Sequence, residues 1–70
     1  MQSEYFILSD GFKITIQGLT LVAGNQFNIY SGTSNYGLYT ILSVEGDTYT
    51  TSTRMPAFSG YYTINVIPKQ

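Results

Sequence analysis

The sequence predicts an all-β fold: a small barrel or sandwich of about six short, mostly antiparallel strands, without significant helix. Apolar and polar side chains alternate in several segments, which places the apolar ones on one face of a strand. Turn signals separate these segments every 8–12 residues or so, as is typical of sandwiches and barrels. No segment carries the apolar repeat of about 3.6 residues that marks an amphipathic helix.

The strands are predicted one by one from these patterns. In the first predicted strand, 4–8, the stretch YFIL (residues 5–8) is continuously apolar, as expected for a strand that is covered on both faces or passes from one sheet to another. In the next strand, 12–17, Phe12, Ile14 and Ile16 alternate with polar neighbours. A short strand is predicted at 19–22. Four more follow at 26–31, 38–44, 47–53 and 61–67.

Turns are predicted where Gly, Asn, Asp and Ser cluster, because these residues tolerate positive φ or bond to the nearby backbone. The clusters lie at 9–11, 23–26, 31–37, 45–47 and 59–60. The stretch SGTSNYG, residues 31–37, carries no charge and is predicted to be a loop. Tyr36 stands out in it, because an aromatic ring at a loop tip has little to pack against unless a partner covers it.

Size and composition predict a single domain, residues 1–70, that associates with other chains. A core in a chain of 70 residues rarely supplies more than about 3–5 kcal/mol. Small domains add disulfides, a metal or a partner subunit, and the chain contains no Cys and no His. Only 10% of its residues are charged and its net charge is −1, so little repulsion keeps copies apart.

No membrane anchor or catalytic constellation is predicted. The N-terminal stretch lacks the basic and apolar regions of a signal peptide, and no apolar run is long enough to span a bilayer. Glu45 and Asp47 could in principle form a glycosidase-like carboxylate pair, but they flank Gly46 in a predicted turn, where acidic residues are common. We therefore expect a non-enzyme without catalytic residues, metal or cofactor.

The segment RMPAFSG, residues 54–60, is the clearest candidate for a contact with another subunit. Pro56 cannot donate a ladder hydrogen bond, so the segment is predicted to leave the sheet. Met55 and Phe58 are then anchors of an intersubunit contact, because Met and aromatic residues are enriched at interfaces. Tyr36 and Tyr30 are predicted to add polar aromatic contacts. In the alternative interpretation Phe58 plugs one end of the barrel.

Residues 23–53 resemble a module of virion structural proteins in tailed bacteriophages. In that module a Gly-Asp strand leads through an Asn/Gly loop into "G-x-[YF]-T-[IV]-x-S-V", a short turn and a Thr-rich strand. Here Gly24 and Asn25 stand at the Gly-Asp position, and Phe27 and Ile29 fill the alternating apolar places. The second half is matched by Asn35, Gly37, Tyr39, Thr40, Ile41, Ser43 and Val44.

The resemblance implies a small β module that binds copies of itself or neighbouring virion proteins, such as major capsid or tail subunits. The expected function is structural: to decorate or stabilise a capsid or tail lattice, without catalysis. The expected location is the virion, assembled in the host cytoplasm.

Two other functions stay open at this stage. A small adhesion or carbohydrate-binding module would use Tyr30, Tyr36 and Tyr39 as sugar platforms. A barrel that binds single-stranded nucleic acid would stack bases on its aromatic rings. The sequence holds only three cationic residues, however, which are too few to track a phosphate backbone, so strong nucleic-acid binding is not expected.

Overall fold

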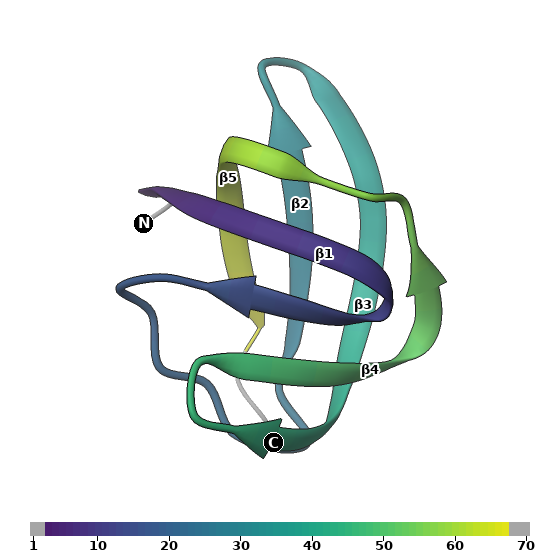
Figure 1. The fold of residues 1–70 in the computed structure, drawn as a ribbon. Helices are drawn as coiled ribbons and strands as arrows, with labels where there is room; N and C mark the ends of the chain where they lie inside the picture. The colour runs from purple at the N-terminus through teal and green to yellow at the C-terminus, as the bar shows by residue number, and fades with distance from the viewer. Residues whose placement is uncertain (1–2, 68–70) are drawn as a thin grey trace.

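The computed structural model of the chain describes residues 3–67, and all of their regular structure is β-strand. The five strands are β1 (Ser3–Ile16), β2 (Gln26–Ser31), β3 (Ser34–Glu45), β4 (Thr48–Met55) and β5 (Ser59–Ile67). They pair antiparallel in the order β1-β4-β3-β2-β5, and β5 pairs with β1 to close the barrel (Figure 1). The all-β prediction is confirmed, and the architecture is the barrel rather than the sandwich.

β1 turns back on itself near its middle (Figure 1). Its first half pairs with β5 and its second half pairs with β4. The chain reverses at Gly11, whose φ of 64° lies in the left-handed region that favours glycine. The amide of Gln17, the residue that follows β1, donates to the carbonyl of Phe6 at 3.2 Å. This bond links the end of the second half of β1 to the first half. The predicted strands 4–8 and 12–17 are therefore two halves of one folded strand.

Alternate residues of each strand point into the barrel and form its core. The buried apolar residues are Ile7, Ile14, Ile16, Leu21, Phe27, Ile29, Tyr39, Ile41, Tyr49, Met55, Phe58 and Ile64. Thr51 is the one buried polar residue among those described, and its hydroxyl lies 3.2 Å from the carbonyl of Phe12 and 2.8 Å from that of Thr53. The period-two pattern of the sequence thus identifies most inward positions, such as Ile14 and Ile16. Phe12 was expected on the same face but is 46% exposed, because the pairing of β1 with β4 shifts register between Gly11 and Lys13.

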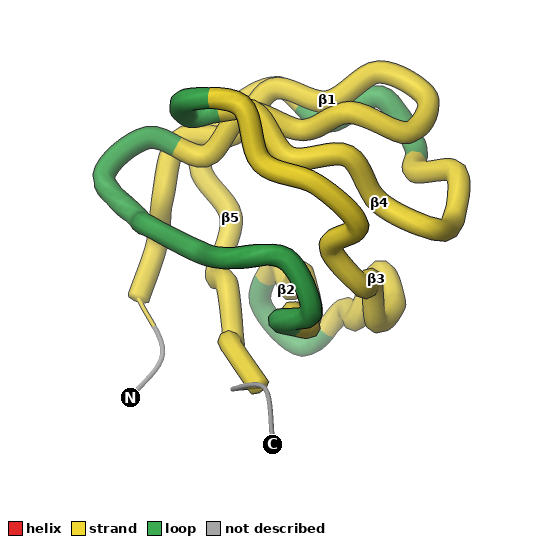
Figure 2. The backbone as a smooth tube through the Cα atoms, turned by 90° about the horizontal axis from the view of Figure 1, so that it is seen from below, coloured by secondary structure: helices red, strands yellow, loops and turns green. Residues whose placement is uncertain are grey.

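The loop between β1 and β2 crosses one end of the barrel, as Figure 2 shows from below. Tyr49 fixes this loop, because its hydroxyl donates to the carbonyl of Leu19 at 2.9 Å and accepts from the amide of Leu21 at 3.1 Å. The short strand predicted at 19–22 is wrong. Its backbone groups bond to a core side chain instead of to a neighbouring strand, so the segment is a loop that covers the barrel end.

The loop of residues 56–58, between β4 and β5, passes in front of β3 and runs beside β1 (Figure 1). Ser9 ties it down: its hydroxyl donates to the carbonyl of Pro56 at 2.6 Å and accepts from the amide of Phe58 at 2.8 Å. The amide of Ser9 also donates to the carbonyl of Phe58 at 3.0 Å. The prediction that Pro56 takes the segment 54–60 out of the sheet is confirmed for residues 56–58 only, because Arg54 and Met55 still belong to β4 and the remaining two residues to β5.

The uncharged stretch 31–37 is a tight hairpin rather than the predicted loop. Only Gly32 and Thr33 form the turn, and β3 begins again at Ser34. Gly32 has a φ of 61°, so it supplies the left-handed residue that this short connection uses. Tyr36 consequently lies within β3 and not at a loop tip.

Candidate interaction surface

The surface of the described residues offers no pocket and no metal-binding cluster. Residues 3–67 hold no group of three or more His, Cys, Asp and Glu side chains, and no concave site is found among them. Every buried side-chain nitrogen or oxygen in this part of the chain has a hydrogen-bond partner. Nor does any helix in residues 3–67 have the length and apolarity to cross a membrane. Candidate sites must therefore be sought on the outer face of the barrel.

Met55 and Phe58, the predicted anchors of an intersubunit contact, lie inside the barrel. Their side chains are 4% and 5% exposed. The barrel closes around them, so both side chains are covered within the chain. The geometry supports the alternative interpretation, in which Phe58 plugs one end of the barrel. Pro56, between them, is exposed on the crossing loop.

The ring of Tyr36 packs over this plug. Its centroid lies 5.3 Å from that of Phe58 and 6.0 Å from that of Tyr62, both in edge-to-face geometry. A bulge in β3 turns the ring in this direction. Asn28 faces Leu38, but Tyr30 faces Asn35, so β3 contains one extra residue over this interval. Tyr36 therefore has neighbours within the chain, although 41% of its surface stays exposed.

The bulge is held by Gly37 and by polar side chains around it. Gly37 has a φ of 113°, and its amide donates to Asn35 Oδ1 at 2.8 Å. The hydroxyl of Tyr39 donates to the carbonyl of Tyr36 at 2.6 Å. Burial raises the pKa of Tyr39 above its usual value. Tyr39 is 5% exposed, so it is a core residue, whereas Tyr30 is half-buried on the outside of β2.

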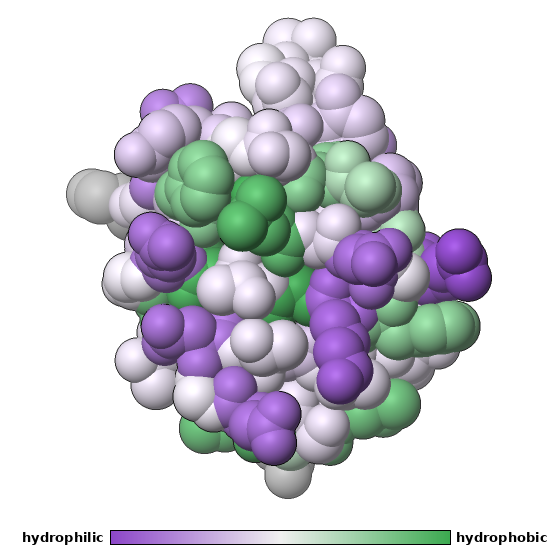
Figure 3. Space-filling model, in the orientation of Figure 1, coloured by the Kyte–Doolittle hydropathy of each residue, from purple (hydrophilic) through white to green (hydrophobic). Residues whose placement is uncertain are grey.

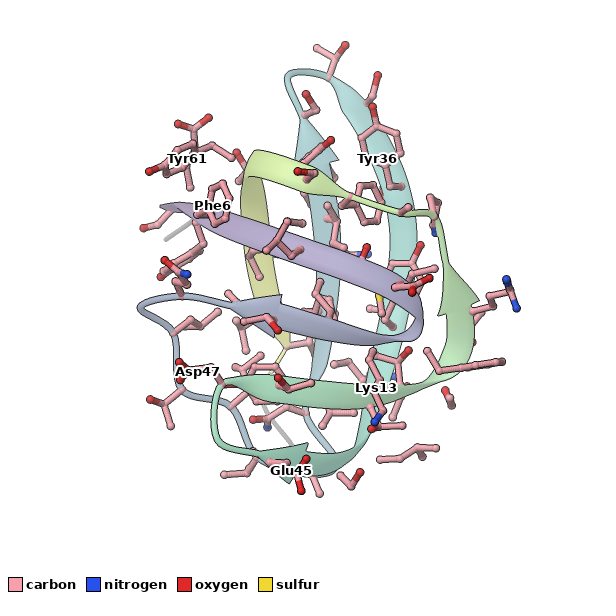
Figure 4. The ribbon with its side chains drawn as sticks, viewed as in Figure 1. Phe6, Lys13, Tyr36, Glu45, Asp47 and Tyr61 are labelled. Carbon is pink, nitrogen blue, oxygen red and sulfur yellow. The ribbon has the colours of Figure 1, made fainter. Side chains whose placement is uncertain are left out.

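An apolar patch on the outer face escaped sequence analysis. Phe6 faces Tyr61 across the pair β1–β5, with ring centroids 5.4 Å apart (Figure 4). Tyr61 is 71% exposed, and Leu8, on the same side of β1, is 46% exposed. The continuous apolar run of β1 is the signal that could have found it. Such a run is typical of a strand that is covered on both faces or passes from one sheet to another, whereas the outer face of β1 is open at Leu8.

The described charged side chains lie on β1, on β4 and where β3 meets β4. Among residues 3–67 they are Glu4, Asp10 and Lys13 on β1, Arg54 on β4, Glu45 at the last position of β3 and Asp47 in the turn that follows. The sequence holds no charged residue from Ile14 to Val44, nor from Met55 to Pro68. Because β5, β2 and β3 are neighbours in the barrel, these uncharged stretches form one continuous side. It is bordered by Glu4 on β1, which faces Thr63 of β5, and by Glu45 at the end of β3.

Figure 3 shows the charged side, with hydrophilic side chains spread over the face that β1 and β4 form. β2 and β5 lie behind these strands in the same view (Figure 1). Figure 4 places Lys13, Glu45 and Asp47 in the half of the molecule that holds β4. The described charges thus lie on β1 and β4 and at the β3–β4 end of the barrel.

We call the outward side of β5, β2 and β3 the uncharged face. Its residues are Thr63, Asn65 and Ile67 on β5, Gln26, Asn28 and Tyr30 on β2, and Leu38, Thr40 and Leu42 on β3. Asn28 lies at its centre, between Asn65 on β5 and Leu38 on β3. Beside this row, Gln26 Nε2 donates to Thr40 Oγ1 at 3.0 Å.

The uncharged face combines amide and hydroxyl groups with exposed apolar side chains. Leu38 and Leu42 are 46% and 58% exposed, and the Asn, Gln and Thr side chains of the face are half-buried. Such a surface can form hydrogen bonds and bury apolar area, but it lacks the cations that would attract nucleic acid. Comparison with protein-family models, with curated proteins and with solved structures finds no match to this chain.

Proposed function

We propose that this protein is a non-catalytic structural protein of a bacteriophage virion, which decorates or stabilises a capsid or tail lattice through contacts between subunits. The observation that carries the proposal is the uncharged face, which spans three of the five strands of a closed barrel. Depletion of charge together with aromatic side chains is typical of the buried centre of protein interfaces.

The stretch that resembles phage virion modules coincides with much of this face. Residues 23–53 run from the turn before β2 through β3 and into β4. Gly24 and Asn25 continue the pairing of β2 with β3, because the amide of Gly24 donates to the carbonyl of Ile41 at 2.8 Å and the amide of Ile41 donates to that of Asn25 at 2.9 Å. The motif thus has a structural role in building the β2–β3 pair, which supports its use as a shared scaffold.

Energetics also favour a protein that works in an assembly. A domain of this size buries only about 60% of the surface that its unfolded chain exposes, so its own core is modest. Any partner that binds only the folded state adds to its stability. A lattice subunit gains such cover on assembly, whereas a catalytic role would need a pocket or a cluster of reactive groups.

The composition of purified phage particles tests this proposal. We expect quantitative mass spectrometry to find the protein at a fixed, multi-copy ratio to the major capsid or tail subunit. Particles that lack it should form at lower yield or break at lower temperature or osmotic stress. Detection only in the lysate of infected cells, and never in purified particles, would overturn the proposal.

A further inference from the structure

We propose that the uncharged face binds the same face of a second copy of this chain, related by a two-fold axis. This inference rests on the proposed structural function and names the surface and the partner that it would use. Three properties of the uncharged face identify the binding partner: its charge, its hydrogen-bonding groups and its extent.

The charge distribution selects a partner that is itself uncharged. A charged side chain brought against this face would lose its water without gaining an ion pair, which is unfavourable. The other side of the same barrel carries Asp10, Lys13 and Arg54, so it is a poor match. The uncharged face of a second copy meets the requirement and brings no like-charge repulsion.

The polar groups of the face are able to pair with themselves. Two-fold association places identical patches against each other, so each group must find a partner in the same set. Asn and Gln amides and Thr and Tyr hydroxyls both donate and accept hydrogen bonds, unlike Lys, Arg or an ionised carboxylate. Asn28 and Asn65, which face each other at the centre of the patch, have this property.

A dimer has to bury a sizeable share of this small barrel. The described chain has an accessible surface of 4314 Å², and a standard interface buries roughly 800 Å² on each partner, about a fifth of this surface. The uncharged face extends over three of the five strands, and the exposed side chains of Leu38 and Leu42 supply apolar contact.

Analytical ultracentrifugation of the full chain over a range of concentrations tests the proposal. We expect reversible dimers for the wild type. Asn65→Lys and Leu38→Lys place a cation on each copy of the face, and we expect each to raise the Kd at least about tenfold. Ser52→Lys is the matched control, because Ser52 is exposed on β4, on the charged side. Its Kd should stay within about twofold of the wild type, and circular dichroism should show the same fold for all variants.

Three results would overturn the inference. The wild type could remain monomeric at millimolar concentration, or Ser52→Lys could weaken the dimer as much as the two face variants. The wild type could also be a monomer that binds oligosaccharides on a glycan array and loses this binding in Asn65→Lys, which would assign the face to sugars. A dimer in solution that is absent from virions would leave this inference standing while the proposed function fails, so the two are tested separately.

Discussion

Phe58 illustrates how one aromatic side chain decides whether a loop is a surface or part of the core. Its ring lies 5.0 Å from that of Tyr62 and 5.3 Å from that of Tyr36, and it is 5% exposed. Both hydrogen-bonding groups of its backbone bond to Ser9. The sequence alone could not distinguish a buried plug of the barrel from an exposed interface anchor, because an apolar residue two positions after a proline is compatible with both.

The position of Phe58 predicts a large loss of stability on truncation. We expect Phe58→Ala to lower the free energy of unfolding by about 3–5 kcal/mol, because it empties a buried aromatic site. Urea unfolding followed by circular dichroism measures this. Tyr61→Ala is the control, since that ring is 71% exposed, and it should cost about 1 kcal/mol or less. Equal stability of Phe58→Ala and the wild type would show that Phe58 is not the plug.

At the scale of the element, β1 depends on one residue for its reversal. Gly11 has a φ of 64°, and a Cβ added there would meet no atom within 4 Å. Backbone conformation, and not space, therefore restricts this position. The turn predicted at 9–11 coincides with this reversal. Local sequence does not reveal that the two halves form one continuous strand, because that depends on pairing with β4 on one side and with β5 on the other.

We predict that Gly11→Ala destabilises the protein by about 1–2 kcal/mol, the usual cost of a left-handed conformation for a residue with a Cβ. Gly11→Asn should cost less, because Asn adopts this conformation more readily. Thermal unfolding of the three proteins under one set of conditions provides the comparison. If alanine and glycine are equally stable at this position, the reversal does not rely on a left-handed residue.

At the scale of the whole molecule, the arrangement of charges limits what the barrel can bind. Lys13 and Arg54 lie on the β1–β4 side together with Asp10, and Lys69 falls outside the described residues. The aromatic rings that a nucleic-acid barrel would use are partly enclosed, since Tyr39 and Phe58 are buried. The uncharged face has no cation to neutralise phosphate.

Binding to single-stranded nucleic acid should therefore be weak and only shallowly dependent on salt. Even if all three basic residues of the sequence met phosphates, the slope of log K against log salt would be at most about 0.7 × 3, roughly 2 in magnitude. Fluorescence anisotropy with a labelled oligonucleotide at several salt concentrations measures the slope. Tight binding with a steeper slope would show that the charge count underestimates the contact.

The sequence by itself determined most of the inward positions within the strands, though not that of Phe12, and the places where the chain turns. Side-chain alternation and the preferences of Gly, Asn and Asp can do this because they act over a few residues. The sequence also excluded disulfides and a Cys or His metal site.

The tertiary structure alone decided that β1 folds back, that Met55 and Phe58 are core residues, and that residues 19–22 form a loop over Tyr49. It also gathered the uncharged stretches on one side of the barrel. These features depend on which strands become neighbours, and that choice is made by contacts between residues far apart in the chain, such as Ser9 with Phe58 and Asn28 with Asn65.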